Sequence, residues 1–376
     1  MITIEQVDLK NRKAVNEFVQ FQYDLYKGVP QFCPPFYADI KLMMNKQKHP
    51  FFEHSDGDFF VARQDGKVAG RIAVMENRPF NKYHQTQKAQ FYLFDSINDQ
   101  EVANKLFDAA FDWARARGLN QIVGPKGFNA FDGYGIQTEG YEHHQMMIMM
   151  NYNFPYYVDL VTNLGFETEV DFMSCYLPVE TFQIPEHINA IAEKVIQRGT
   201  LKVVNFKSKA DVKKFAPKIG EAYNDTFINN WEYYPLSKRE VKKLLDDLLT
   251  LVVPGLIKII MHEDKIVGFL LGFPDITEAL QRGKGHITPW AIIDIMRSVK
   301  TTKWISLNGA GVLPEYYGRG ANALLYYEMG KTLRDSHQFV HGELTQVANT
   351  AEQMRKDMIR SGGIPYKNHR VYHRDI

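Results

Sequence analysis

The feature that most constrains this fold is an internal repeat, in which the second half of the chain reproduces the order of the first. The segment GKVAGRIAV at residues 66–74 matches DKIVGFLLG at residues 264–272, roughly 200 residues later. The ends of the halves also match, because residues 153–166 and 349–364 each contain an asparagine, a helical stretch, a glycine and a strand. A repeat of this length indicates a domain duplication, since solenoid repeats have far shorter periods.

Each half is predicted to contain a strand, helices, an antiparallel hairpin, and then two strand–helix pairs before a closing strand. The hairpins are indicated by turns at Asp65-Gly66 and Glu263-Asp264 between apolar runs. This order predicts an α/β fold, with a mixed sheet, helices on both faces and a ligand crevice where neighbouring strands splay apart. We expect domains at residues 1–179 and 199–376, joined by the polar, proline-bearing stretch 180–198.

Composition excludes several classes of protein. The 376 residues carry a formal net charge of +1, so no electrostatic surplus favours nucleic acid. Two cysteines are too few for a disulfide framework or a cysteine zinc site, and we expect no bound metal. The polar N-terminus and the lack of a long apolar run predict a cytoplasmic protein without a membrane span. We expect a monomer or a homodimer.

A glycine-rich turn in the second half is the clearest candidate for a binding site. Residues 307–328 read LNGAGVLPEYYGRGANALLYYE. A short strand at residues 304–307 is predicted to run into the glycine-broken segment 309–311, and an apolar helix begins at Ala321, after Gly318-Arg319-Gly320. A helix N-terminus presents unpaired N–H groups and partial positive charge, and glycine lets a phosphate approach. Arg319 could add a permanent charge. The other interpretation is an ordinary strand–turn–helix connection with a solvated arginine.

This turn and its surroundings resemble the GNAT-type N-acetyltransferases. Residues 312–316 and Gly318-Arg319-Gly320 are similar to that family's coenzyme A motif, and Asn349 with Gly362-Gly363 to its closing segment. The whole chain resembles a bacterial group of tandem, two-domain GNAT proteins. The resemblance implies that acetyl-CoA or another acyl-CoA is used to acylate an unknown small-molecule amine or peptide. The residues that it implies for acyl-CoA binding are Gly311, Val312, Tyr317, Gly318, Arg319, Gly320, Ala321, Asn322, Ala323 and Asn349.

The sequence departs from the family pattern at several places. Tyr317 stands at the position of the motif's first Gln or Arg, and Asn322 stands at that of its last Gly or Ala. Lys356 stands where the family usually has a tyrosine that acts as the general acid. The equivalent turn in the first half, residues 94–99, has no glycine and carries two carboxylates. We therefore expect the first half to bind no cofactor and to be structural or to bind the acceptor.

Three residues are candidates for catalysis. Acylating an amine requires a neutral nucleophile, although an ordinary lysine-type amine has a pKa near 10.4. Glu343, just inside the predicted fifth strand of the second half, is the first candidate for the base, and Asp275 is its rival. Glu343 could instead be a solvent-facing carboxylate. Tyr316, Tyr317 or Tyr366 could serve as the acid, with Tyr316 chosen first, and a backbone N–H at Gly311 or Val312 could stabilise the oxyanion.

The acceptor is expected near the loop at residues 229–235, where Asn230, Trp231, Tyr233 and Tyr234 accompany the carboxylate of Glu232. The insertion 276–303 is a possible lid.

Two alternatives for the function of the protein stay open. One is a non-catalytic module that binds a small molecule or lipid on a duplicated GNAT scaffold. The other is acyl transfer from a carrier protein or another large donor, by a tandem fold like that of the N-myristoyltransferases.

Overall fold

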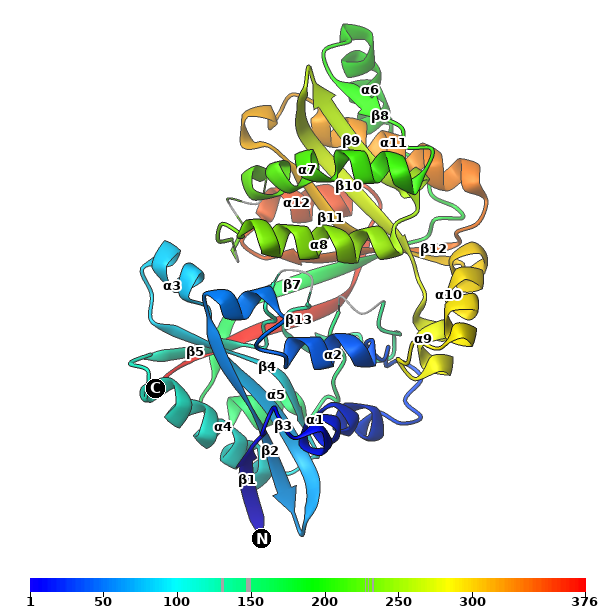
Figure 1. Ribbon diagram of the computed structural model, residues 1–376. Coiled ribbons are helices and arrows are strands. Elements are labelled where there is room, and N and C mark those ends of the chain that lie inside the picture. The colour runs from blue at the N-terminus through cyan, green and yellow to red at the C-terminus, as the bar shows by residue number, and fades with distance from the viewer. Residues whose placement is uncertain (130–131, 147–149, 227, 229, 232) are drawn as a thin grey trace. The chain divides into compact units, whose positions relative to one another are not determined.

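The computed structural model describes residues 1–129, 132–146, 150–226, 228, 230–231 and 233–376 (Figure 1). The chain divides into two compact units. Unit 1 comprises Met1–Phe172, Thr277–Ile295 and Lys367–Ile376, and unit 2 comprises Met173–Ile276 and Met296–Tyr366. The units thus interleave along the sequence, whereas the predicted domains 1–179 and 199–376 are contiguous.

Unit 1 is a mixed sheet with helices. Its strands follow the order β1-β2-β3-β4-β5-β13, with β6 paired to β13. The helices and strands that lie wholly within it are β1 (Ile2–Gln6), α1 (Arg12–Leu25), α2 (Tyr37–Met43), β2 (Asp56–Gln64), β3 (Lys67–Glu76), α3 (Arg78–His84), β4 (Lys88–Ser96), α4 (Gln100–Arg115), β5 (Gln121–Gly124), β6 (Ile136–Glu139), α5 (Tyr157–Thr162) and α9 (Thr277–Gly283), with the short 3-10 helix η1 (Pro50–Glu53). Three elements contribute residues to both units: β7 (Glu167–Leu177), α10 (Pro289–Thr301) and β13 (Ile364–Asp375).

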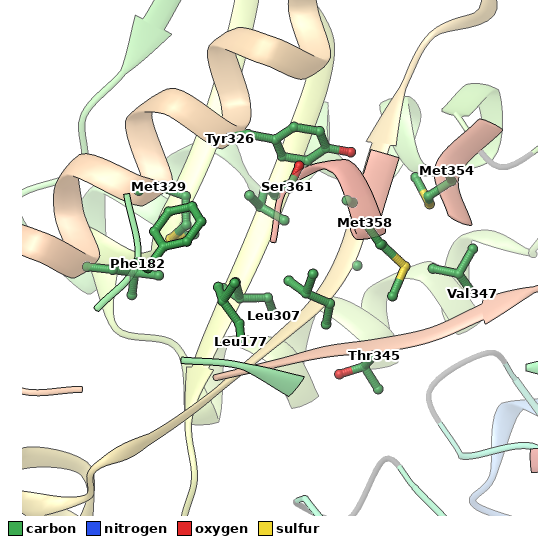
Figure 2. A pocket seen from close by; sticks show the side chains of 16 residues that line it. Leu177, Phe182, Leu307, Tyr326, Met329, Thr345, Val347, Met354, Met358 and Ser361 are labelled. Carbon is green, nitrogen blue, oxygen red and sulfur yellow. The ribbon is translucent and has the colours of Figure 1, made fainter. Parts of the chain in front are cut away.

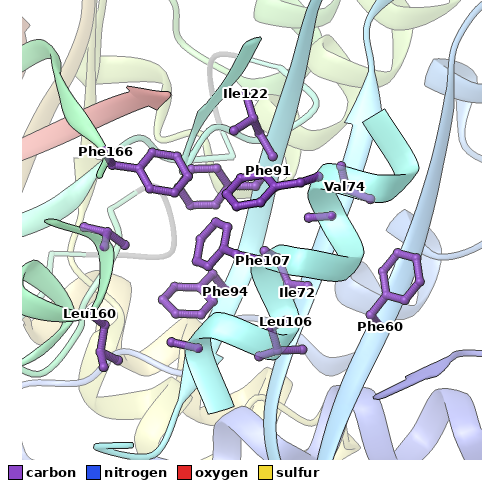
Figure 3. Close-up of a cluster of buried hydrophobic side chains, with 14 of the residues drawn as sticks. Phe60, Ile72, Val74, Phe91, Phe94, Leu106, Phe107, Ile122, Leu160 and Phe166 are labelled. Atoms are coloured by element: carbon purple, nitrogen blue, oxygen red, sulfur yellow. The ribbon is translucent and has the colours of Figure 1, made fainter. Parts of the chain in front are cut away.

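The largest core of unit 1 lies between helix α4 and strands β3 and β4. Leu106 and Phe107 of α4 are fully buried, and Phe107 packs edge-on against Phe91 of β4. Figure 3 shows this cluster, in which Phe166 also packs edge-on against Phe107. The apolar residues of α4 recur at helical spacing, so one face of the helix is buried in this core.

Unit 2 repeats this plan. Its strands follow the order β12-β11-β10-β9-β8. Its own elements are α6 (Glu186–Arg198), β8 (Lys202–Val204), α7 (Lys209–Thr226), α8 (Lys238–Leu251), β9 (Ile257–His262), β10 (Lys265–Pro274), β11 (Trp304–Val312), α11 (Ala321–Ser336), β12 (His341–Ala348) and α12 (Glu352–Arg360), with 3-10 helices η2 (Pro254–Leu256) and η3 (Pro314–Tyr316).

The duplication extends to backbone details. Both predicted hairpins are present, and their turns place Asp65 and Glu263 at positive φ of 51° and 53°. In each unit one parallel strand pair is short, ending at Gln90↔Val123 between β4 and β5 and at Leu307↔Leu344 between β11 and β12. Each unit therefore has strands that separate beyond this point, as expected from the sequence.

Three segments have more regular structure than was predicted from the sequence. The stretch assigned to a linker contains helix α6, and the insertion 276–303 forms helices α9 and α10. Strand β11 also continues to Val312, five residues past the predicted short strand at 304–307. Glycines explain the last difference, because Gly309 and Gly311 reduced the apparent strand propensity without breaking the pairing with β10.

Candidate functional site

An apolar pocket lies in unit 2 where β11 and β12 separate. It encloses about 720 Å³, including the part open to solvent. Figure 2 shows the side chains of helices α11 and α12 on one side of the pocket and those of the strands on the other. The lining residues are Leu177, Phe182, Leu270, Leu307, Gly309, Ala310, Tyr326, Met329, Gly330, Leu333, Leu344, Thr345, Val347, Met354, Met358 and Ser361.

The pocket lining is suited to hydrocarbon. Only Tyr326, Thr345 and Ser361 contribute side-chain hydroxyl groups, and the other side chains are aliphatic, aromatic or methionine. Methionine adapts its shape to an irregular or variable ligand. From Tyr326 to Leu333 the lining follows roughly 10 Å of α11. A pocket of this kind can bury an extended apolar chain.

A β-bulge shapes the strand edge beside the pocket. Leu270 pairs with Ala310 but Gly272 pairs with Leu307, so β11 carries one extra residue at Asn308–Gly309. Gly309 has a positive φ of 91°, which favours glycine. The bulge therefore lies just before Gly311 and Val312, the two residues whose N–H groups were suggested as oxyanion donors.

The backbone donors of β11 alternate between its two neighbours. The N–H of Leu313 donates to the carbonyl oxygen of Val267 at 2.9 Å, on the β10 side. By alternation the N–H of Val312 is directed to the other side, where β12 has separated, and that of Gly311 faces β10. Of the two suggested oxyanion donors, the geometry thus favours Val312.

The N-terminus of α11 is capped by glycine. Gly318 and Gly320 both have positive φ, 72° and 86°, and no side chain accepts a hydrogen bond from the first helical N–H groups. The N–H groups of Ala321, Asn322 and Ala323 lie in the first turn, which has no intrahelical acceptor.

The neighbouring side chains leave this turn open to solvent on one side. Arg319 and Tyr317 are exposed, and the guanidinium of Arg319 lies 5.4 Å from the ring of Tyr316. On the other side α6 packs against Gly320, where an added Cβ would lie 2.5 Å from Val195.

The equivalent helix of unit 1 is capped differently. The carboxylate of Asp99 accepts hydrogen bonds from the N–H groups of Glu101 and Val102 at the start of α4, so these two donors are already used. Asp95, near the end of β4, is buried in an ion pair with Arg71 at 2.7 Å. Two carboxylates thus lie between β4 and α4 or at their ends, and one of them caps α4.

The face of β12 opposite Leu344 carries a buried carboxylate. Glu343 is 0% exposed, which excludes the solvent-facing alternative, and it lies beside Ser306 in the parallel register. The hydroxyl of Tyr366, from β13, donates a hydrogen bond to Oε2 of Glu343. Burial raises the pKa of Tyr366 far above its ordinary value, and the charge and hydrogen bond of Glu343, with the charge of Asp275, raise it further. The phenol therefore stays protonated.

The pocket extends toward this face. Thr345, two residues after Glu343, lines the pocket. Its hydroxyl group forms one hydrogen bond, 3.0 Å long, with the hydroxyl group of Ser306. Asp275 is also buried, and its N–H donates to the carbonyl oxygen of Trp304 at the start of β11. The structure thus brings Glu343, Asp275 and Tyr366 into one region.

An aromatic group on the same side of the sheet was missed from the sequence. The hydroxyl of Tyr176 lies 2.8 Å from Nδ1 of His341, and its ring is 6.1 Å from that of Tyr366. The ring of His341 packs 4.6 Å from Trp304. The available signal was strand alternation, because His341 and Glu343 are two residues apart and share a face.

Other predicted site residues lie elsewhere in unit 2. The hydroxyl of Tyr316 interacts with Nδ1 of His262 at 2.7 Å, and its ring belongs to the core. Tyr316 follows the far end of β11, roughly 20 Å along the strand from Ser306 and hence from Glu343. Asn349 is exposed in the turn between β12 and α12.

The predicted acceptor loop is only partly described, and Glu232 lies outside the described residues. The side chain of Tyr234 is buried and its hydroxyl donates to Glu240, which also completes the capping box of α8. Trp231 and Tyr233 are half-buried, and Asn230 is exposed in a turn with Tyr233.

Two features are absent from the described residues. None of the helices described is both long and apolar enough to cross a bilayer. Within the same residues no group of three or more His, Cys, Asp or Glu side chains could hold a metal ion.

Two features of unit 2 define the fold class: a splayed strand pair beside a bulge, and a glycine-capped helix. Unit 1 repeats the order of the strands, with an aspartate in place of the glycine cap. The chain has the GNAT fold in two copies. It superimposes on the tandem GNAT protein from the clavulanic acid biosynthesis pathway with a TM-score of 0.56, 10% identity, and coverage of 100% of this chain and 98% of that one. It also matches a glucosamine N-acetyltransferase region of a fungal β-N-acetylglucosaminidase, with a TM-score of 0.58, 12% identity and coverage of 100% and 38%.

Two curated proteins are similar over nearly the whole chain. Protein YghO of Escherichia coli K12 is 24% identical over 371 residues, covering 97% of this chain and 94% of that protein. The bacterial ceramide synthase of Caulobacter vibrioides is 24% identical over 379 residues, covering 98% and 97%. No family model matches the chain.

Proposed function

We propose that the protein is an acyl-CoA-dependent N-acyltransferase whose site lies in unit 2, and that its acyl group is longer than acetyl. The observation that carries the proposal is the apolar pocket at the separation of β11 and β12. An acetyl group has one methyl group to bury, whereas this lining follows about 10 Å of α11. The name of the ceramide synthase relative points the same way, because a ceramide is an N-acylated long-chain amine.

The residues present fit the donor substrate. The first N–H groups of α11 and the exposed guanidinium of Arg319 would hold its diphosphate. The N–H of Val312 would donate to the thioester oxygen as negative charge develops there, and losing such a donor typically costs about 2.7–4 kcal/mol. Tyr317, Gly318, Gly320 and Asn349 would border the same binding region, where glycine permits close approach.

Glu343 is proposed as the base. The acceptor amine loses a proton to Glu343 while its nitrogen bonds to the acyl carbon, and the bond from carbon to sulfur breaks. The proton then passes to the departing thiolate. Tyr366 is a positioning residue, because its hydrogen bond fixes one carboxylate oxygen and so sets the direction of the other. Asp275 adds negative charge near this pair, and Tyr316 is too far along β11 to reach it.

The direct test measures release of free thiol and formation of amide, using acyl-CoA chains from acetyl to palmitoyl and a panel of small polar and long-chain amines. We expect turnover to favour the longer chains. Met354→Trp should fill the pocket and shift the preference to shorter chains, with affinity for long chains lowered about tenfold or more. Ile359→Trp is the matched control, because Ile359 lies on the same helix but is 50% exposed and outside the lining.

The outcomes separate this proposal from its alternatives. Binding at 100 times the dissociation constant should stabilise the protein by about 2.7 kcal/mol. If acyl-CoA gives no thermal shift while free fatty acids or lipids do, a non-catalytic binding module is favoured. Turnover with acetyl-CoA alone, unchanged in Met354→Trp, would show that the acyl group is short. Turnover only with an acylated carrier protein would point to a protein donor.

A further inference from the structure

Helix α10 exposes a row of large apolar side chains. Trp290 is 79% exposed, Met296 61%, Ile293 57% and Ile292 47%. Positions 290, 293 and 296 are three residues apart, so these side chains share one face of the helix. Single exposed apolar residues are ordinary, but a contiguous apolar surface marks a site of interaction.

The rest of the helix is anchored by ordinary packing. Ala291 is buried, and Ile295 and Val299 are half-buried. Asp294, the sole carboxylate within α10, accepts hydrogen bonds of 2.8 and 3.0 Å from Arg282 of α9. Helix α10 therefore packs on the protein through a different face from the exposed one. The negative charge of Asp294 is offset by the positive charge of Arg282.

Cations continue the exposed row. Arg297 and Lys300 are exposed, and they follow Ile293 by four and seven residues, on the same face. The N-terminal part of this face is apolar and aromatic, while its C-terminal part is cationic. Figure 1 shows α10 following α9 in the segment that the sequence singled out as an insertion.

We propose that this face of α10 docks on the surface of a bilayer that contains anionic lipid. Trp290, Ile293 and Met296 would enter the headgroup region, and Arg297 and Lys300 would contact lipid phosphates. A helix that combines tryptophan and aliphatic residues with basic residues matches this environment. Long basic side chains lay their methylene stems on apolar surface while the charge stays in the aqueous layer.

The same pattern is less suited to a protein partner. The centre of a protein interface is depleted in charged residues, whereas Arg297 and Lys300 lie within this row. A symmetric dimer through α10 would also bring two copies of both cations into one interface. Anionic lipid satisfies the apolar and the cationic parts together.

The test is co-sedimentation of the full chain with vesicles of phosphatidylcholine alone or with about a third phosphatidylglycerol. We expect binding to the anionic vesicles that weakens in high salt, with a blue shift of tryptophan emission that Trp290→Phe removes. Ile293→Asp should abolish binding. The double change Arg297→Glu with Lys300→Glu should lower the partition coefficient by roughly 25-fold or more, since each basic residue contributes about fivefold.

Controls keep this test separate from folding and catalysis. Ile196→Asp replaces an equally exposed isoleucine on α6, 48% exposed, and should bind like the unmodified protein. All variants change exposed side chains and should melt at nearly the same temperature. Equal vesicle binding by Ile293→Asp, or no anionic binding by the unmodified chain, would overturn the proposal. A concentration-dependent dimer that Ile293→Asp disrupts would assign the face to a second copy instead. Acyl transfer to a soluble amine is measured without vesicles, so either proposal can fail alone.

Discussion

At the scale of single residues, the carboxylate of Glu343 is the strongest catalytic candidate, and Glu343→Gln tests it. The amide oxygen can still accept the hydrogen bond from Tyr366, so the local structure should persist. The amide cannot take a proton from the amine, and we expect kcat to fall about 10²–10⁴-fold. Steady-state kinetics with a long-chain acyl-CoA would measure the change, alongside acyl-CoA affinity, which should be nearly unchanged.

The positioning role of Tyr366 predicts a different signature. Tyr366→Phe leaves the base in place but frees its orientation, so the loss in kcat should be smaller than for Glu343→Gln. Substrate affinity should again change little. Full activity in Glu343→Gln would remove this carboxylate from the mechanism and make Asp275 the next candidate. Tyr316→Phe is the control, since its hydroxyl interacts with His262 away from this region.

The sequence predicted part of this region for an identifiable reason. Glu343 was chosen because it lies just inside the predicted fifth strand of the second half, near the point where the strands were expected to splay apart. The contact with Tyr366 could not be predicted, because it joins β12 to β13 across a strand order that local sequence does not contain. Tyr176 and His341 were missed for the same reason, since their pairing joins strands 165 residues apart.

At the scale of elements, the N-termini of α4 and α11 are alternative solutions for the same structural position. Asp99 fills the first with a carboxylate, whereas Gly320 leaves the second without a side-chain acceptor. This difference follows from the sequence alone, and it gave the prediction that only the second half holds a diphosphate. Helix α6 was not predicted, because the residues before and within it were interpreted as a proline-bearing linker.

Asn322→Asp separates anion binding from helix stability. A carboxylate in the first turn of α11 interacts favourably with the helix dipole, so the free energy of unfolding should stay the same or rise by about 0.3–1 kcal/mol. The same charge should repel a diphosphate and weaken CoA binding about tenfold, less so in high salt. Isothermal titration and urea unfolding would measure the two effects. Asn322→Gln keeps the site neutral and serves as control; equal CoA affinity in Asp and Gln variants would contradict the assigned phosphate position.

Gly320→Ala and Gly318→Ala form a matched pair for the packing of α6 on α11. Both residues have positive φ, so each alanine should cost about 1–2 kcal/mol of backbone strain. At Gly318 no atom lies within 4 Å of the added Cβ, whereas at Gly320 Val195 would lie 2.5 Å away. We expect Gly320→Ala to be more destabilising by about 1–3 kcal/mol in urea unfolding. Similar losses for both variants would show that α6 yields easily at this contact.

At the scale of the whole molecule, the last strand, β13, contributes residues to both compact units. Tyr366 of β13 belongs to unit 2 and approaches Glu343. Lys367–Ile376 belongs to unit 1, where Tyr372–Asp375 pairs with β5. The repeat predicted the order of the main strands and helices in each half. It could not predict this interleaving, because an internal repeat reports which elements recur and not which copy a terminal strand joins.

The unit 1 part of β13 gives the stability of the protein a defined pH dependence. His369 is fully buried, and Nε2 lies 3.0 Å from the carbonyl oxygen of Asn151. Burial lowers the pKa of His369 from 6.5 to about 4; the contact with Asn151 opposes this shift, and the charge of Lys367 adds to it. Because the unfolded chain binds the proton more readily between these values, the free energy of unfolding should fall as the pH drops from about 6.5 to 4, by about 3 kcal/mol in all.

His369→Gln should remove this dependence while keeping an N–H donor toward Asn151. Urea unfolding at several pH values would compare the two proteins, so that carboxylates common to both cancel in the difference. The variant should be less stable at pH 7 because its side chain fits the site less well, and the gap should narrow as the pH falls toward 4. Parallel stability curves over this range would mean that His369 becomes protonated without unfolding, and that β13 opens locally to admit water.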